Sequence, residues 1–149
     1  MKKIMFICTG NICRSAMAEK LLKKKAEELK LKIQVYSCGT STISGDKPTQ
    51  EAIEVMEERD INLKPHRATN IIDSNIQEMD LILCATSMHK NVVSDMYPEL
   101  KEKVFTIKEY AGEIAEGLDI QDPFGYGKMK YEKCAQELEK SIDKIIKKL

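Results

Sequence analysis

The chain has 149 residues, of which 42% are hydrophobic, so its length and composition predict one domain, residues 1–149, with its own core. Its 24 Lys and Arg residues balance its 24 Asp and Glu residues, and no global charge indicates nucleic acid or a membrane surface as a partner. No apolar run approaches the roughly 20 residues that span a bilayer. The apolar stretch that follows Lys3 is also too short for the core of an export signal.

The cysteines occur without regular spacing, which is not typical of a disulfide framework. Cys38 and Cys84 end apolar strand-like runs and Cys134 falls on an apolar helical stripe, so we expect these three to be small buried hydrophobes. There is no C-x-x-C pair, and only His66 and His89 could supply imidazole ligands, so we expect no zinc site. The simplest interpretation is a reduced, cytoplasmic protein without a bound metal.

Strand-like and helical segments alternate along the chain. Four apolar segments predict strands, at residues 2–9, 33–38, 79–85 and 104–107. Four segments with apolar residues at helical spacing predict helices, at residues 15–31, 49–60, 87–95 and 129–148. Ser87 is the expected N-cap of the third helix. The alternation predicts a doubly wound α/β fold, a four-stranded parallel sheet flanked by helices, with the ligand beyond the carboxyl ends of the strands.

The loop that follows the first predicted strand, residues 8–15, reads C-T-G-N-I-C-R-S. Between a strand and a helix, its backbone N–H groups can converge on an anion, and the helix N-terminus adds partial positive charge. Cys8 would lie in that positive site, which favours its nucleophilic thiolate. Arg14, on the first helical turn, can hold two oxygens of the same anion through its planar guanidinium group. The combination predicts transfer of a phosphoryl group to the sulfur of Cys8.

Phosphoryl transfer to sulfur also needs a group that protonates the leaving oxygen and then activates a water molecule. Asp122 is the candidate, because it lies in the long glycine-containing loop at residues 112–127 and is held in an extended conformation by Pro123. An ordinary Asp-Pro turn is the alternative that this spacing leaves open. His66 and His89 could act as acid or base, but their positions favour structural roles.

The motifs I-C-T-G-N-I-C-R-S-x-M-A-E at residues 7–19 and D-P-F-G at residues 122–125 resemble the low-molecular-weight protein tyrosine phosphatase family. The likeness covers essentially the whole chain, including its length and its order of elements. It implies a flavodoxin-like domain that acts on a phosphorylated protein substrate and uses no metal or cofactor. We expect such a phosphatase to be a monomer, without nucleic acid or membrane partners.

The resemblance also implies a role for each matching catalytic position. Cys8 is the expected nucleophile, Arg14 the phosphate clamp, and Asp122 the general acid that afterwards acts as the base. The expected substrate-binding residues are those of the loop itself: Thr9, Gly10, Asn11, Ile12, Cys13, Arg14 and Ser15.

Further roles around the loop are likewise implied by the resemblance. Asn11 and Ser15 match positions that fix the loop backbone and hydrogen-bond the thiolate. Ser37 and His66 match positions that support the loop from outside. Cys13 matches the partner that can form a reversible disulfide with the nucleophile and protect it from deeper oxidation.

Two features bear on the choice of substrate. Phe124 and Gly125 after the Asp-Pro pair, together with residues 104–110, look more like the bacterial protein arginine phosphatases than like the tyrosine phosphatases of the family. The arginine phosphatases, however, carry Thr where this chain has Ile12, whose apolar side chain suits a flat ring better than a polar, nitrogen-linked group. We therefore predict phosphotyrosine as the substrate and keep phosphoarginine as the alternative.

Two further alternatives are less well supported by the sequence. The arsenate reductases that share the first loop need two more cysteines after the third strand, and residues 85–91 contain no second thiol to follow Cys84. The loop could also bind a phosphorylated partner without turnover, or Cys8 and Cys13 could act only as a redox sensor. The presence of candidates for the nucleophile, the clamp and the acid favours an enzyme.

Overall fold

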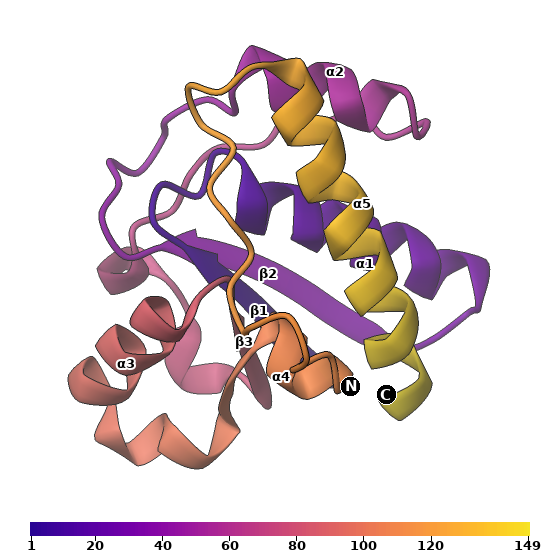
Figure 1. The fold of residues 1–149 in the computed structure, drawn as a ribbon. Helices are drawn as coiled ribbons and strands as arrows, with labels where there is room; N and C mark the ends of the chain where they lie inside the picture. The colour runs from indigo at the N-terminus through magenta and orange to yellow at the C-terminus, as the bar shows by residue number, and fades with distance from the viewer.

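The sheet of this protein is four-stranded and parallel. The computed structural model describes all residues from Met1 to Leu149. Its strands are β1 (Lys2–Cys8), β2 (Ile33–Gly39), β3 (Leu81–Cys84) and β4 (Val104–Thr106). They lie in the order β2-β1-β3-β4 (Figure 1), so the winding reverses between β1 and β3 and opens a ligand position beyond the end of β1. The predicted doubly wound sheet is confirmed.

Helices cover both faces of the sheet. They are α1 (Arg14–Glu28), α2 (Gln50–Glu57), α3 (Ser87–Met96), α4 (Ile107–Ala111) and α5 (Lys128–Ile145). Short 3-10 turns follow at Ile71–Asp73, Ile76–Glu78, Pro98–Lys103 and Ile146–Lys148. On one face of the sheet, α1 and α2 both pack against α5. Helix α3 covers the other face (Figure 1).

The central strand β1 is apolar on both faces. Ile4 and Phe6 belong to the core under α1 and α5, and Met5 and Ile7 belong to the core on the α3 side. All four side chains are at most 1% exposed. Because successive residues of a strand point to opposite faces, a sheet covered on both sides needs such an unbroken apolar run. No helix of the structure is both long and apolar enough to cross a membrane.

Most predicted boundaries differ from the structure by one to three residues, and two predictions at helix starts are wrong for an identifiable reason. Strand β4 ends at Thr106 because the Thr106 side chain accepts from the backbone N–H of Glu109 at 3.0 Å and the Glu109 carboxylate accepts from the Thr106 N–H at 3.1 Å. This capping box starts α4 at Ile107, which the apolar pattern had placed in the strand. Likewise Thr86, rather than Ser87, caps α3, because its hydroxyl accepts from the N–H of His89 at 3.2 Å.

Three strand ends and one late loop meet at a single edge. In the sheet register Cys8 pairs with Gly39 and Ile7 pairs with Cys84. The N–H of Ile120 donates to the carbonyl of Ala85 at 2.8 Å, so the loop at 112–127 passes the same edge. Figure 1 shows this segment rising from α4 past the sheet to the start of α5. The loops that carry the candidate site residues are therefore neighbours.

Candidate active site

Cys8 lies at the centre of the loop formed by residues 8–15, which we call the phosphate loop. Its side chain is buried, and its Sγ lies 2.9 Å from the hydroxyl oxygen of Ser15. The backbone N–H groups of Asn11 and Ser15 also donate to this sulfur, at 3.3 and 3.4 Å. A buried sulfur that receives two backbone donors and lies beside a hydroxyl group is well suited to carry the negative charge of a thiolate.

Asn11 holds the loop in an unusual backbone conformation. Its φ is +55°, a left-handed geometry that costs a non-glycine residue roughly 1–2 kcal/mol. The fully buried side chain offsets this cost: Nδ2 donates to Ser15 Oγ at 2.8 Å and to Ser37 Oγ at 2.9 Å, and Oδ1 accepts from the Thr69 N–H at 2.9 Å. The Asn11 carbonyl accepts from His66 Nε2 at 2.7 Å. The structure therefore places Ser37 and His66 against the loop, where the family resemblance expected them.

Glu19 supports this network from α1, and the sequence did not indicate it. The carboxylate is 7% exposed and accepts from Ser37 Oγ at 2.5 Å and from Lys23 Nζ at 2.7 Å. Burial opposes its ionisation, but the hydrogen bonds from Lys23 and Ser37 outweigh burial and hold the pKa of Glu19 below its usual value. Glu19 is therefore a carboxylate at neutral pH and can only accept.

A carboxylate at one end gives this hydrogen-bond chain a direction. Ser37 must donate its proton to Glu19, so its oxygen accepts from the Asn11 amide. The other amide hydrogen goes to Ser15, whose own proton is then free for Cys8 Sγ at 2.9 Å, a closer acceptor than the Cys38 carbonyl at 3.5 Å. The chain thus fixes the Ser15 hydroxyl as a donor to the sulfur.

Arg14, near the end of the phosphate loop, is buried and has one N–H donor without a partner. Its Nη1 donates to the carbonyl of Ile120 at 2.9 Å, and its Nη2 lies 3.7 Å from Asp122 Oδ2. Its Nε is buried and has no hydrogen-bond partner. A buried unpaired donor is costly, and an oxyanion held by the phosphate loop would satisfy it.

Asp122 is brought to the phosphate loop from 114 positions along the chain after Cys8. Its side chain is 52% exposed, its Oδ1 accepts from the N–H of Phe124 at 3.1 Å, and the same oxygen lies 3.9 Å from Cys13 Sγ. Burial raises the pKa of Cys13 to about 12, and the charges of Cys8 and Asp122 add to this effect. Asp122 therefore has access to solvent while it lies beside Cys13 and the candidate clamp Arg14.

His89 connects the phosphate loop to α3, which the sequence did not indicate. Its Nε2 lies 2.7 Å from Thr9 Oγ1, and its Nδ1 lies 2.7 Å from Thr86 Oγ1. Burial, aided by the positive charge of Arg14, lowers the pKa of His89 to about 4. The ring is therefore neutral at pH 7 and bridges two hydroxyl groups, a structural role as expected.

The loop at residues 39–48 forms a second wall. The N–H of Thr40 donates to the Cys8 carbonyl and that of Ser41 to the Thr9 carbonyl, both at 3.0 Å. A Cβ on Gly39 would lie 2.5 Å from the Thr9 carbonyl oxygen, so only glycine fits this close approach. Ile12 is partly buried and packs on the core beside this wall.

The structure also bears on the remaining cysteines and on the possible metal ligands. All five cysteines are free and buried, which confirms the interpretation of the three distant ones as core residues: Cys38, Cys84 and Cys134. No group of three or more His, Cys, Asp or Glu side chains is arranged to hold a metal ion. The predicted loop residues 8–15 and Asp122 are assembled at one edge of the sheet, where they can bind an oxyanion against a sulfur nucleophile.

The fold and this site define a family. The family model described as low molecular weight phosphotyrosine protein phosphatase matches residues 3–149, and the chain belongs to this family, which confirms the resemblance of its motifs. A protein-arginine-phosphatase of Bacillus subtilis is 36% identical over 98% of this chain and 95% of its own length. The low molecular weight protein-tyrosine-phosphatase PtpB of Staphylococcus epidermidis is 33% identical over 96% of both chains. The crystal structure of a low molecular weight protein tyrosine phosphatase from T. tengcongensis is 38% identical, with a TM-score of 0.93 over the whole of both chains.

Proposed function

We propose that this protein is a phosphatase that hydrolyses phosphotyrosine in proteins through a cysteinyl-phosphate intermediate. The observation that carries the proposal is the buried Cys8 sulfur with three hydrogen-bond donors, next to an Arg14 Nε that has no partner. A thiolate and an unsatisfied cationic donor at one site are what a tetrahedral phosphate ester requires. The proposal takes the chain as a single domain, residues 1–149, that acts as a cytoplasmic monomer without metal or cofactor.

In the first step, the Cys8 thiolate attacks phosphorus in line with the leaving oxygen. The phosphorus–sulfur bond forms as the phosphorus–oxygen bond breaks, and Asp122, as the acid, donates its proton to the departing phenolate. Arg14 and the loop N–H groups stabilise the charge on the three equatorial oxygens. Because each donor is already oriented, little reorganisation accompanies the reaction.

In the second step, the Asp122 carboxylate accepts a proton from water as that water attacks the phosphocysteine. The phosphorus–sulfur bond breaks, inorganic phosphate leaves and the Cys8 thiolate is restored. The half-exposed position of Asp122 supports this double role, because the group must meet both a leaving oxygen and a water molecule.

Ile12 supports phosphotyrosine as the substrate. Its side chain lies 3.4 Å from where a Cβ of Gly10 would be, so an apolar surface covers this part of the loop. An aromatic ring gains from such a surface, whereas a guanidinium group would lose hydrogen bonds to water there. Phosphoarginine remains the second candidate, because a relative 36% identical to this chain is a protein-arginine-phosphatase.

The test is a comparison of kcat/KM on matched phosphotyrosine and phosphoarginine peptides, for the parent and for Ile12→Thr, with a metal chelator present. We expect the parent to favour phosphotyrosine and Ile12→Thr to shift the ratio toward phosphoarginine by about tenfold or more, because a site that hydrogen-bonds its substrate discriminates strongly. Cys8→Ser provides the blank and should show no turnover. A parent that favours phosphoarginine overturns the substrate, and turnover by Cys8→Ser overturns the mechanism.

A further inference from the structure

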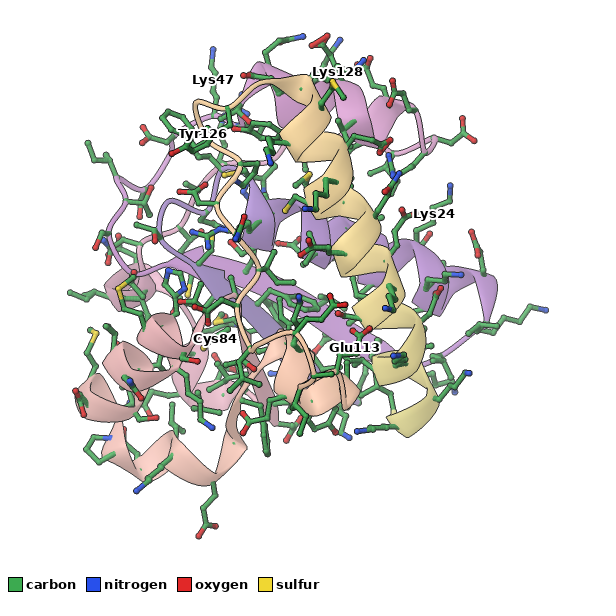
Figure 2. The ribbon with its side chains drawn as sticks, in the orientation of Figure 1. Lys24, Lys47, Cys84, Glu113, Tyr126 and Lys128 are labelled. Atoms are coloured by element: carbon green, nitrogen blue, oxygen red, sulfur yellow. The ribbon has the colours of Figure 1, made fainter.

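A hollow of about 540 Å³ lies next to the phosphate loop but is separate from it. It is bounded by the loop that carries Asp122 and by the first turns of α5. Its lining consists of Gln121, Asp122, Pro123, Phe124, Tyr126, Lys130, Lys133, Cys134 and Glu137. No residue of the phosphate loop lines it, and Asp122 is the side chain that the two regions share. Figure 2 shows Tyr126 on this loop, close to where α5 begins at Lys128.

The acidic side chains of the hollow are paired with cations outside it, whereas its two lysines are unpaired. Both acids already have cationic neighbours, since Asp122 lies 3.7 Å from Arg14 and Glu137 lies 3.8 Å from Lys108. Lys130 and Lys133 are exposed and form no ion pair with any carboxylate of the chain. Their spacing of three residues places both ammonium groups on one face of α5. The hollow therefore offers two unpaired positive charges.

Aromatic rings form the opposite side. The Phe124 and Tyr126 side chains are 57% and 73% exposed, although they are large and apolar. Exposed rings next to unpaired charges are typical of a surface that a partner covers. A segment of a protein substrate could place its backbone against the rings while an acidic side chain reaches the ammonium groups.

We propose that this hollow is a docking subsite for an acidic side chain, Asp or Glu, that lies a few residues from the phosphorylated residue of the substrate. The inference rests on the proposed function, because Asp122 connects the hollow to the phosphate loop and a bound phosphoresidue brings its neighbours there. The two lysines supply charge complementarity, and the paired acids do not oppose it. The subsite selects among phosphoproteins rather than among phosphorylated side chains.

The test uses phosphotyrosine peptides of one sequence in which a single Asp or Lys is moved through three positions on each side. In the parent, we expect kcat/KM for the Asp peptide to exceed that for the Lys peptide about two- to fivefold at the favoured position, the range for an exposed ion pair. Raising the salt to about 0.5 M should reduce this preference. Lys130→Ala with Lys133→Ala should abolish it, and Lys130→Glu with Lys133→Glu should reverse it.

The matched control replaces two other exposed, unpaired lysines, Lys101→Glu with Lys147→Glu, which changes net charge equally and should leave the preference intact. Equal kcat/KM for Asp and Lys peptides at every position, or a preference that survives both Lys130/Lys133 variants, overturns the subsite. Failure of the parent to hydrolyse any phosphotyrosine peptide or an aryl phosphate instead contradicts the proposed function. The two failures are therefore distinguishable.

Discussion

The phosphate loop and the segment that carries Asp122 meet at one edge of the sheet, but the chain holds them in different ways. The phosphate loop is tied to three distant parts of the chain by side-chain hydrogen bonds to Ser37, His66 and His89, and Glu19 in turn holds Ser37. The segment at residues 119–127 is held to the rest of the fold mainly by hydrogen bonds of its first two residues, Asp119 and Ile120. Most of its later residues are exposed to solvent.

The difference fits what each region does in the proposed mechanism. A sulfur nucleophile and the N–H groups that bind the anion must be held in one geometry. Buried hydrogen bonds fix that geometry. In the proposed mechanism, Asp122 gives a proton to the leaving oxygen and takes one from water, which requires contact with solvent. The comparison predicts that substitutions in the first region affect stability and reactivity together, whereas those in the second affect catalysis alone.

Asp122→Asn should give the largest effect and should leave the fold intact. We expect kcat for phenyl phosphate, which has a poor leaving group, to fall by about 10²–10⁴-fold, since the variant cannot protonate the phenolate. The loss should be smaller for 4-nitrophenyl phosphate. Asp119→Asn is the matched control, because Asp119 lies in the same segment and its Oδ1 only accepts from the Ser87 N–H at 2.8 Å. Equal losses in the two variants, or an unchanged kcat in Asp122→Asn, would exclude the acid role.

Ser37→Ala should lower both the stability of the fold and the reactivity of Cys8. It removes one hydrogen-bond partner from the buried Asn11 amide and one from the buried Glu19 carboxylate, so the free energy of unfolding should fall by about 1–3 kcal/mol. Asn11 also loses one of the hydrogen bonds that hold its amide toward Ser15, so the Ser15 hydroxyl is less firmly directed at the sulfur, and iodoacetamide should alkylate Cys8 about two- to tenfold more slowly at pH 7.

Ser141→Ala is the control for this variant. Ser141 is also fully buried and donates to a carboxylate, that of Glu113, at 2.5 Å, but it lies on α5 away from the loop; Figure 2 labels Glu113 beside that helix. It should lose similar stability and keep the parent's alkylation rate. If both variants slow alkylation equally, the hydrogen-bond chain does not tune Cys8.

The sequence predicted the parts of the site that are encoded locally. Cys8 and Arg14 lie on one strand–loop–helix unit, and Asp122 is marked by Pro123 and its glycine-containing loop. The parallel sheet then explains how these segments meet, since strand ends share an edge. The local sequence was enough to predict these residues because each motif is formed by residues that are close together in the chain.

The supporting contacts could not be predicted because they join distant positions without a local signal. Thr9 and His89 are 80 residues apart, and Glu19 on α1 looks like any acidic residue of a solvated helix face. The same limit applies to the start of α4. The capping residues Thr106 and Glu109 stand in the sequence, but Ile107 also completes an apolar strand pattern, and only the packed fold decides between them.

The last prediction concerns the pH dependence of stability, through His89. A histidine whose pKa falls from its usual value near 6.5 to about 4 on folding contributes its full stability above about pH 6.5, where the ring is neutral in both states. As the pH falls, the unfolded chain binds the proton first, so this contribution declines and is lost by about pH 4. Asp119 and Asp122 oppose the shift, while burial and Arg14 cause it.

Urea unfolding between pH 7 and pH 4 tests this for the parent and for His89→Gln, which cannot titrate in this range. The parent should lose stability more steeply than the variant as the pH falls, because the variant lacks one proton-binding site in its unfolded state. His66→Gln should retain the contribution of His89 and show only the loss of its own, since burial also lowers the pKa of His66. If the free energy of unfolding changes with pH in the same way for the parent and for His89→Gln, the His89 ring is not held neutral by the fold. In that case the His89 bridge from Thr9 to α3 is weaker than its 2.7 Å contacts indicate. The phosphate loop would then be held less firmly, and would differ less from the exposed segment that carries Asp122.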